Sequence, residues 1–152
     1  MRRNDKEIKD SNEIERLLQE PSVCRIAMVD REVPYIIPVN FAVESGVLYI
    51  HSAKTGKKVE ILRRNPSVCF EMDIPGDLVE GDRACQWGMK YMSLIGFGKA
   101  VFLESGVEKK KALDILMKKY AGRDDFSYAD EALDKVLIIG IQIESVSGKK
   151  SG

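Results

Sequence analysis

The chain has 152 residues, of which 44% are hydrophobic and 32% charged, which suits one folded domain with one core. Lys and Arg together number 24, as do Asp and Glu, so no basic excess favours nucleic acid or a membrane surface as a partner. No apolar run approaches the roughly 18 residues of a transmembrane helix, and the charged start lacks the apolar segment of a signal peptide. We therefore expect a cytoplasmic protein with a single domain over residues 1–152.

The cysteines and the single histidine do not form a recognisable site. Cys24, Cys69 and Cys85 are far apart in sequence and include no CxxC pair, and His51 is the only histidine. This spacing predicts neither a disulfide framework nor a zinc site. Cys24 and Cys69 lie in apolar runs, so we expect both in the core.

The first third of the chain predicts a helix followed by strands. Residues 1–20 read as helical, with Asp10 and Glu13 as a capping box and Pro21 at the end. Strands are predicted at 23–29, at 34–43 and at 47–51. Pro38 interrupts the second strand, which predicts a bulge, an edge or an exposed segment there. Residues 44–46 predict the turn of an antiparallel hairpin.

The remainder predicts three further strands and two helices. A basic segment at 52–58 precedes a short helix at 59–64, and a longer helix is expected at 108–120, with Gly122 as its C-cap. Strands are predicted at 67–72, 91–103 and 136–146, with an acidic loop at 73–83, a loop or weak helix at 124–134 and a polar tail. Gly96 and Gly98 indicate a bend or a close approach to the backbone. Because no long helices separate the early strands, we expect a closed or nearly closed antiparallel barrel with flanking helices.

The segment HSAKTGKK at 51–58 is the strongest candidate for a ligand site. It joins a strand end to a helix start, where unsatisfied backbone N–H groups attract anions. Lys57 and Lys58 add positive charge, and Ser52 and Thr55 add hydroxyl donors, so the segment suits a phosphate monoester. A solvated basic turn explains the same residues equally well. It is not a P-loop, because His51 stands where the first glycine is needed.

A second candidate is CQWGMKY at 85–91, which holds Trp87, the only tryptophan. An aromatic side chain beside small residues can form the wall of a site for a planar ligand. The alternative is that Trp87 fills a core or a subunit interface.

Several segments together resemble the pyridoxamine-phosphate-oxidase-like flavin proteins with a split β-barrel, in the branch related to nitroimidazole-resistance proteins. They are VCRIAMVDREVPYIIPVNFAVESGVLYIHSAKTGKKVEILRRNPSVCFEMD, CQWGMKYMSLIGFGKAVFL and IQIESVSGKKSG, in the same order as in the family. The resemblance implies a mainly β fold, a six-stranded antiparallel split β-barrel (Greek key) with flanking helices. It also implies FMN bound between the two subunits of a homodimer.

The resemblance assigns roles to particular residues. The strand matching Ile37 to Asn40 lines the flavin ring, Lys57 and Lys58 bind the phosphate, and the stretch around Trp87 arrives from the second subunit. The cofactor-binding residues that it implies are Ile37, Pro38, Val39, Asn40, His51, Ser52, Thr55, Lys57, Lys58, Trp87, Ser93 and Ile95. No metal is expected.

The expected function follows from the same resemblance. It is that of an FMN-dependent oxidoreductase that acts on a small-molecule substrate or electron acceptor, and a nitroreductase-like activity is one possibility. His51 is the catalytic candidate, because histidine is the side chain that titrates near neutral pH. The C-terminal Trp and Arg elements of true pyridoxamine phosphate oxidases have no counterpart here, which argues against that substrate. The alternatives are a non-enzymatic flavin-binding redox sensor or carrier, the same barrel holding haem or a deazaflavin, and a small barrel for single-stranded nucleic acid.

Overall fold

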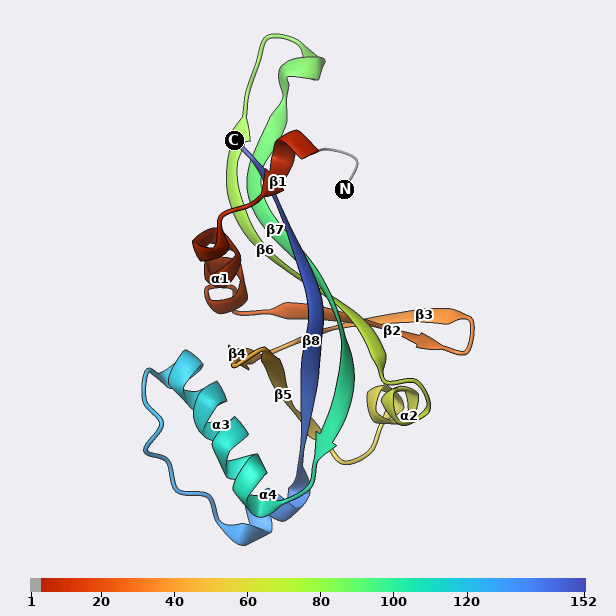
Figure 1. Ribbon diagram of the computed structural model, residues 1–152. Coiled ribbons are helices and arrows are strands. Elements are labelled where there is room, and N and C mark those ends of the chain that lie inside the picture. Colours follow the sequence, from red (N-terminus) through yellow and green to blue (C-terminus); the bar gives the residue numbers. More distant parts are fainter. Residues whose placement is uncertain (1–3) are drawn as a thin grey trace.

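One antiparallel sheet with helices at its sides organises the chain (Figure 1). The computed structural model describes residues 4–152. The strands are β1 (Glu7–Ile8), β2 (Cys24–Asp30), β3 (Val33–Val39), β4 (Ala42–Glu44), β5 (Val47–Ala53), β6 (Ser67–Val79), β7 (Gly88–Leu103) and β8 (Val136–Ser151). The helices are α1 (Ser11–Gln19), α2 (Lys57–Arg64), α3 (Gly106–Ala121) and α4 (Asp130–Lys135), with short 3-10 turns η1 (Asn4–Lys6) and η2 (Ala84–Gln86).

The sheet is open. Its strands follow the order β3-β2-β6-β7-β8-β5-β4, and β1 pairs with the far end of β8. All the pairings are antiparallel, which confirms the mainly β split-barrel prediction, although the described residues form eight strands where six were predicted. Because β3 is an edge strand, Pro38 needs no ladder partner on its outer side, which explains how proline is tolerated there.

The predicted strand 34–43 is divided in two, and the break lies at Asn40 and Phe41 rather than at Pro38. The backbone N–H of Phe41 donates to the hydroxyl of Tyr120 at 2.9 Å, and Asn40 Nδ2 donates to the carbonyl of Ser22 at 3.4 Å. These bonds replace the ladder of a continuous strand. The chain then enters β4, and Ser45 and Gly46, with φ of 52° and 76°, form the predicted hairpin turn to β5.

The helix predicted over residues 1–20 is shorter in the structure. Residues 1–3 lie outside the described part of the chain, and α1 begins only after β1. Asp10 caps it by accepting from the N–H of Asn12 at 2.8 Å, as an N-cap residue should. The predicted capping box is not complete, because the Glu13 carboxylate accepts from Lys150 Nζ at 2.7 Å instead of from the backbone N–H of Asp10.

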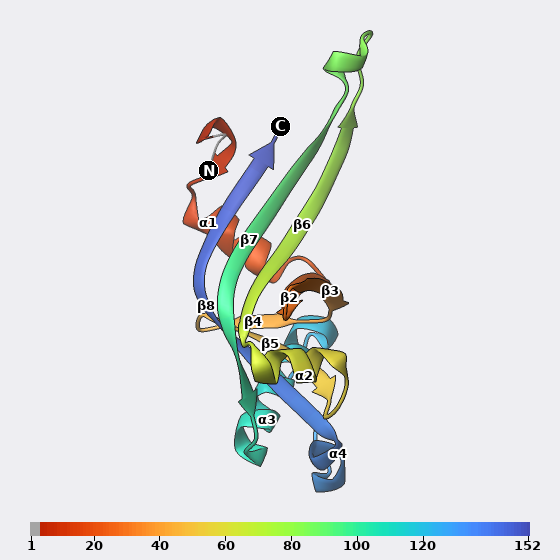
Figure 2. The same cartoon turned by 90° about the vertical axis from the view of Figure 1, so that its right-hand side faces the viewer.

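The loop predicted at 73–83 is the main correction. Strand β6 continues to Val79 and β7 begins at Gly88, so the two form a long hairpin that extends beyond the helices (Figures 1 and 2). We call residues 73–92 of this hairpin the arm. The last strand is also longer than the predicted 136–146, because β8 continues through the polar tail to Ser151 along β7. Burial alternation does not mark the outer arm, where residues 75–80 and 82–90 are exposed on both faces, so the sequence there shows no core-facing period.

The predicted helices are present with small shifts. Helix α2 begins at Lys57, α3 spans Gly106–Ala121 from a Ser105 N-cap, and Gly122 adopts the left-handed C-cap conformation with φ of 72°. Helix α4 occupies part of the segment predicted as a loop or weak helix. No helix within residues 4–152 is both long and apolar enough to span a membrane.

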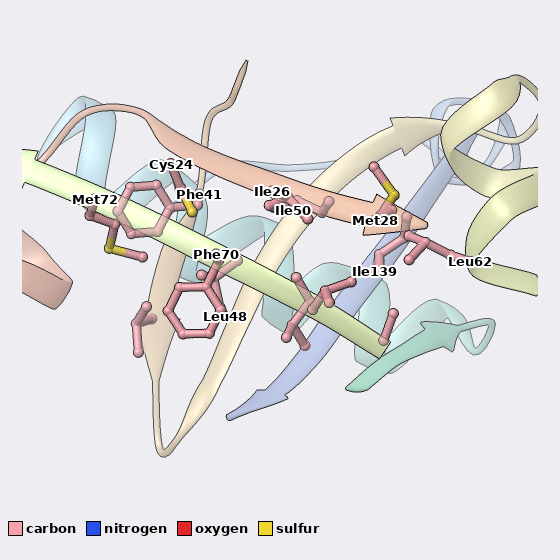
Figure 3. Close-up of a cluster of buried hydrophobic side chains, with 14 of the residues drawn as sticks. Cys24, Ile26, Met28, Phe41, Leu48, Ile50, Leu62, Phe70, Met72 and Ile139 are labelled. Atoms are coloured by element: carbon pink, nitrogen blue, oxygen red, sulfur yellow. The ribbon is translucent and has the colours of Figure 1, made fainter. Parts of the chain in front are cut away.

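The core lies inside the curved sheet and is closed by α1 and α2 (Figure 3). Phe41 and Phe70 are its largest fully buried side chains, and Cys24 lies among them as predicted. The same prediction is wrong for Cys69, which alternates with the buried Val68 and Phe70 and is only partly buried. Gly96 faces the ring of Phe70 so closely that a Cβ at Gly96 would overlap it. Gly98 meets the carbonyl of Gln142 in the same way, beside a register shift between β7 and β8. Both glycines therefore permit close approach, as one of the two predictions for them stated.

Candidate functional site

The start of α2 presents backbone donors that no side chain caps. Gly56 is the N-cap residue, its φ is 124°, and it makes no side-chain hydrogen bond to the first turn. A Cβ at Gly56 would meet nothing within 4 Å, so the space beside this helix end is open. Free N–H groups at a helix start carry partial positive charge and bind anions. The local backbone therefore fits a phosphate group.

The two lysines that follow differ in environment. Lys58 is half-buried, and desolvation lowers the pKa of its ammonium group. No ion pair or hydrogen bond satisfies its Nζ within residues 4–152, so an anion at the helix start would offset the cost of its burial. Lys57 is exposed, and its Nζ lies 4.6 Å from the centroid of the Tyr35 ring on β3.

A groove of about 850 Å³ runs beside Lys57, between α2 and the β2–β3 turn. The residues that line it are Asp30, Arg31, Glu32, Val33, Lys57, Glu60 and Arg64. Three of them are acidic and three basic, and Arg64 already pairs with Asp30 at 2.7 Å. This groove has no net positive charge, so the capacity to bind an anion lies at Gly56–Lys58 rather than in the groove.

The predicted ring-lining segment lies on edge strand β3. Ile37 and Val39 are half-buried against the core, whereas Pro38 is exposed and pairs in register with Arg25. Asn40 follows the strand and is exposed. The outward side of this segment is therefore available to a planar ligand, although the inner side is occupied by the core.

Two residues that were both predicted to bind the cofactor point to opposite sides of strand β5. Ser52 shares the core-facing side of the strand with Leu48 and Ile50, and its hydroxyl donates to the carbonyl of Ala53 at 2.9 Å. His51 is exposed and points to the opposite side, because successive side chains of a strand alternate. Thr55 is exposed in the loop before Gly56.

Trp87, Ser93 and Ile95 lie along β7 and its entry. Ile95 pairs with Glu71 near the start of β6, whereas Trp87 is far from α2 within one chain. Trp87 is at the tip of the arm, half-exposed, and its indole N–H donates to the carbonyl of Gly81 at 2.6 Å. Strand β6 begins at Ser67, just after the end of α2, and ends at Val79 near the tip of the arm. At about 3.4 Å per residue, its length is roughly 40 Å. The structure therefore groups residues 51–58 and the β3 segment at one end, and leaves Trp87 at the other.

Two features were missed from the sequence. Tyr35 supports Lys57 through its ring, a contact that depends on the β3 register and has no sequence signal. The outer side of the sheet also carries an apolar row in register across four strands, made by Ile36, Ala27, Cys69 and Phe97. Ile36 and Phe97 are 61% and 52% exposed, and Ile95 beside them is 46% exposed. We call these five residues the outer apolar face.

The chain matches a known family over nearly its full length. The family model described as pyridoxamine 5'-phosphate oxidase matches residues 10–150. A search of the curated proteins found no significant match.

Solved structures agree with this family match. A candidate 5-nitroimidazole antibiotic resistance protein from Bacteroides thetaiotaomicron is 34% identical, with a TM-score of 0.85 over 95% of this chain and 86% of that one. A FAD-binding protein from Mesorhizobium loti is 25% identical, with a TM-score of 0.69 over 94% of this chain and 96% of that one. A FAD- and haem-binding protein from Mycobacterium smegmatis is 18% identical and shares the fold, with a TM-score of 0.86 over 96% of this chain and 73% of that one.

Proposed function

Because the chain belongs to the pyridoxamine 5'-phosphate oxidase family, we propose that it is a flavoprotein that binds FMN between the subunits of a homodimer and acts as an oxidoreductase. The observation that carries this proposal is the uncapped start of α2, where Gly56 leaves open space beside free N–H groups and the half-buried Lys58 has no anionic partner. A phosphate monoester satisfies all three features at once. The similarity of the chain to the FAD-binding protein from Mesorhizobium loti supports a flavin as the cofactor.

The separation of the predicted site residues supports the homodimer. One chain places Trp87 roughly 40 Å of strand away from α2, so a site that contains both needs a second chain. The outer apolar face, with Ile36, Ile95 and Phe97 exposed, is the kind of surface that a subunit interface covers. We propose that two chains pair through this face and that Ser93, Ile95 and Trp87 approach the flavin of the partner.

In this proposal the flavin supplies hydride or electron transfer when it is bound. The protein's residues hold and orient it: Lys57 and Lys58 bind the phosphate, with Ser52 and Thr55 beside them. The β3 segment from Ile37 to Asn40 flanks the ring. A small nitro compound is the acceptor that the Bacteroides relative suggests.

The first test is the visible spectrum of the purified protein after addition of FMN and removal of the excess. We expect flavin bands to remain with the wild-type chain and to be lost in the double variant Lys57→Ala/Lys58→Ala. The matched control is Lys110→Ala/Lys111→Ala, which removes an exposed lysine pair from α3 and should leave the bands intact. Riboflavin, which lacks the phosphate, should bind at least about tenfold more weakly than FMN, since a charge-assisted phosphate contact contributes more than 1.4 kcal/mol.

Other cofactors give distinct outcomes in the same experiment. If the wild-type chain takes up FAD but no FMN, the proposed cofactor is FAD rather than FMN, and the family assignment is unchanged. Uptake of haem or a deazaflavin instead of any flavin would contradict the flavoprotein proposal. A flavin that stays bound, but that NAD(P)H does not reduce and no acceptor reoxidises, would favour a non-enzymatic sensor or carrier.

His51 is proposed as the proton donor of the reaction, and its exposure on β5 leaves it accessible to a substrate. We expect His51→Ala to retain FMN but to lower turnover of a nitro substrate by about 10²-fold or more, the usual contribution of general acid catalysis. Steady-state rates at saturating reductant measure this. An unchanged kcat with a normal flavin spectrum would remove His51 from the mechanism.

A further inference from the structure

A groove of about 700 Å³ lies between α1, α3 and the β4–β5 turn, and none of the residues assigned to the flavin lines it. Its apolar lining comes from Leu18, Ala42, Val43, Ile115, Ile143 and Val146. Its polar rim holds Glu15, Gln19, Glu44, Lys118 and Lys119. Figure 1 shows α1 and α3 on the same side of β8, with β4 between them. The groove is therefore a distinct feature of the fold.

Lys119 on this groove carries a charge that is not paired. Its Nζ is buried and has no hydrogen-bond partner among the described residues. The ammonium lies 3.4 Å from the centroid of the Phe41 ring, which is itself fully buried in the core (Figure 3). A cation–π contact returns only part of the hydration that a lysine ammonium loses on burial. Desolvation accordingly lowers the pKa of Lys119 to about 8.

The other charges of the rim are already used or balanced. Glu15 accepts from Gln19 Nε2 at 3.0 Å, and the same amide donates to the carbonyl of Val43 at 3.1 Å. Lys118 lies 3.9 Å from Asp124. Glu15 and Glu44 balance the formal charges of Lys118 and Lys119, so the groove lacks the cationic excess that a phosphate dianion needs, and the Lys119 ammonium is the cation there that has no described partner. A ligand with one negative charge and an apolar body matches this arrangement.

We propose that the groove binds a small amphipathic carboxylic acid, with its chain on Leu18, Ile115 and Ile143 and its carboxylate paired with Lys119 Nζ. The four-carbon stem of lysine allows the ammonium to turn from Phe41 toward the ligand, where a charge-assisted hydrogen bond replaces the ring contact. This site is independent of the proposed flavin site and needs no cofactor.

The test uses octanoate as the probe and the full chain as purified, with the same flavin content in every sample. Isothermal titration calorimetry measures the affinity, and methyl NMR shifts of Ile115 and Ile143 locate the ligand. We expect saturable binding of octanoate, with 1-octanol, its uncharged analogue, binding at least roughly tenfold more weakly, as the loss of one hydrogen bond to a charged group implies.

Two variants separate the lysine's charge from its bulk. Lys119→Met keeps an apolar stem, should fold as judged by its melting curve, and is expected to bind octanoate at least roughly tenfold more weakly. Lys118→Met, its exposed neighbour, is the matched control and should bind as the wild type does. Equal affinity for octanoate and 1-octanol, undiminished binding by Lys119→Met, or methyl shifts outside the groove would each overturn the proposal.

Discussion

At the scale of single residues, the buried ammonium of Lys119 is the least satisfied polar group described in the molecule. Burial lowers its pKa from 10.5 to about 8, so above pH 8 the unfolded chain holds a proton at this residue that the folded chain has released. The free energy of unfolding therefore rises with pH through this group. Around it, the Tyr120 ring centroid lies 5.9 Å from Nζ and the nearby Cys24 raises its pKa, while Glu15 and Glu44 line the same groove.

We expect Lys119→Met to be more stable than the wild type at pH 7, with the difference shrinking by about 1 kcal/mol between pH 7 and pH 9. Urea denaturation at several pH values measures this. The comparison stops near pH 9 because burial raises the pKa of the Cys24 thiol from 9.0 to about 12. Above pH 9 the unfolded chain loses this proton first, and the free energy of unfolding then falls with pH through Cys24. Parallel pH profiles of the two proteins would show that the Lys119 ammonium is solvated.

At the scale of elements, the packing of β6 on β7 depends on Gly96. A side chain there would enter the space of the Phe70 ring, and Phe70 has no exposed surface toward which it could move. The strand pair also carries Cys69, Ile95 and Phe97 of the outer apolar face, so a shift in this packing would reach the proposed subunit interface. Sequence alone indicated a special glycine here and left open whether the backbone bends or is approached.

We expect Gly96→Ala to lower the free energy of unfolding by about 1–3 kcal/mol through overpacking. Gly106→Ala is the matched control, because nothing lies within 4 Å of a Cβ at the start of α3, and alanine favours a helix. Chemical denaturation of both variants gives the comparison. A Gly96→Ala variant as stable as the control would mean that Phe70 has room to rearrange.

At the scale of the whole molecule, the arm and the outer apolar face define the proposed assembly. The arm extends beyond the helices in both views (Figures 1 and 2), and it exposes Leu78, Trp87 and Met89 at 56%, 50% and 52%. Exposed apolar groups on a sheet of this size favour association.

We expect the wild-type chain to have twice its 17.1 kDa mass in solution, and Phe97→Asp to shift it toward a monomer that retains less FMN. Light scattering after size exclusion measures the mass. Val107→Asp introduces the same charge at an 80% exposed apolar residue on α3, and should stay dimeric. A dimeric Phe97→Asp would place the interface elsewhere, and a monomeric wild type would contradict the homodimer.

Much of the fold could be read from the sequence because its signals are local. The alternation at 136–146 predicted a strand, Asp10 and Gly122 marked helix ends, and Pro38 marked an edge or irregularity. The arm could not be read in this way. Both of its faces meet solvent in one chain, so its residues carry no alternation between core and surface.

The candidate site divides in the same manner. Residue types and spacing alone determined that HSAKTGKK joins a strand to a helix and offers donors and positive charge to an anion. Only the tertiary structure decided that Ser52 and His51 point to opposite sides of β5, that Lys58 is half-buried, and that Lys119 reaches Phe41. The physical reason is range: helix starts and turns depend on neighbouring residues, whereas burial and convergence depend on strands paired across the whole chain.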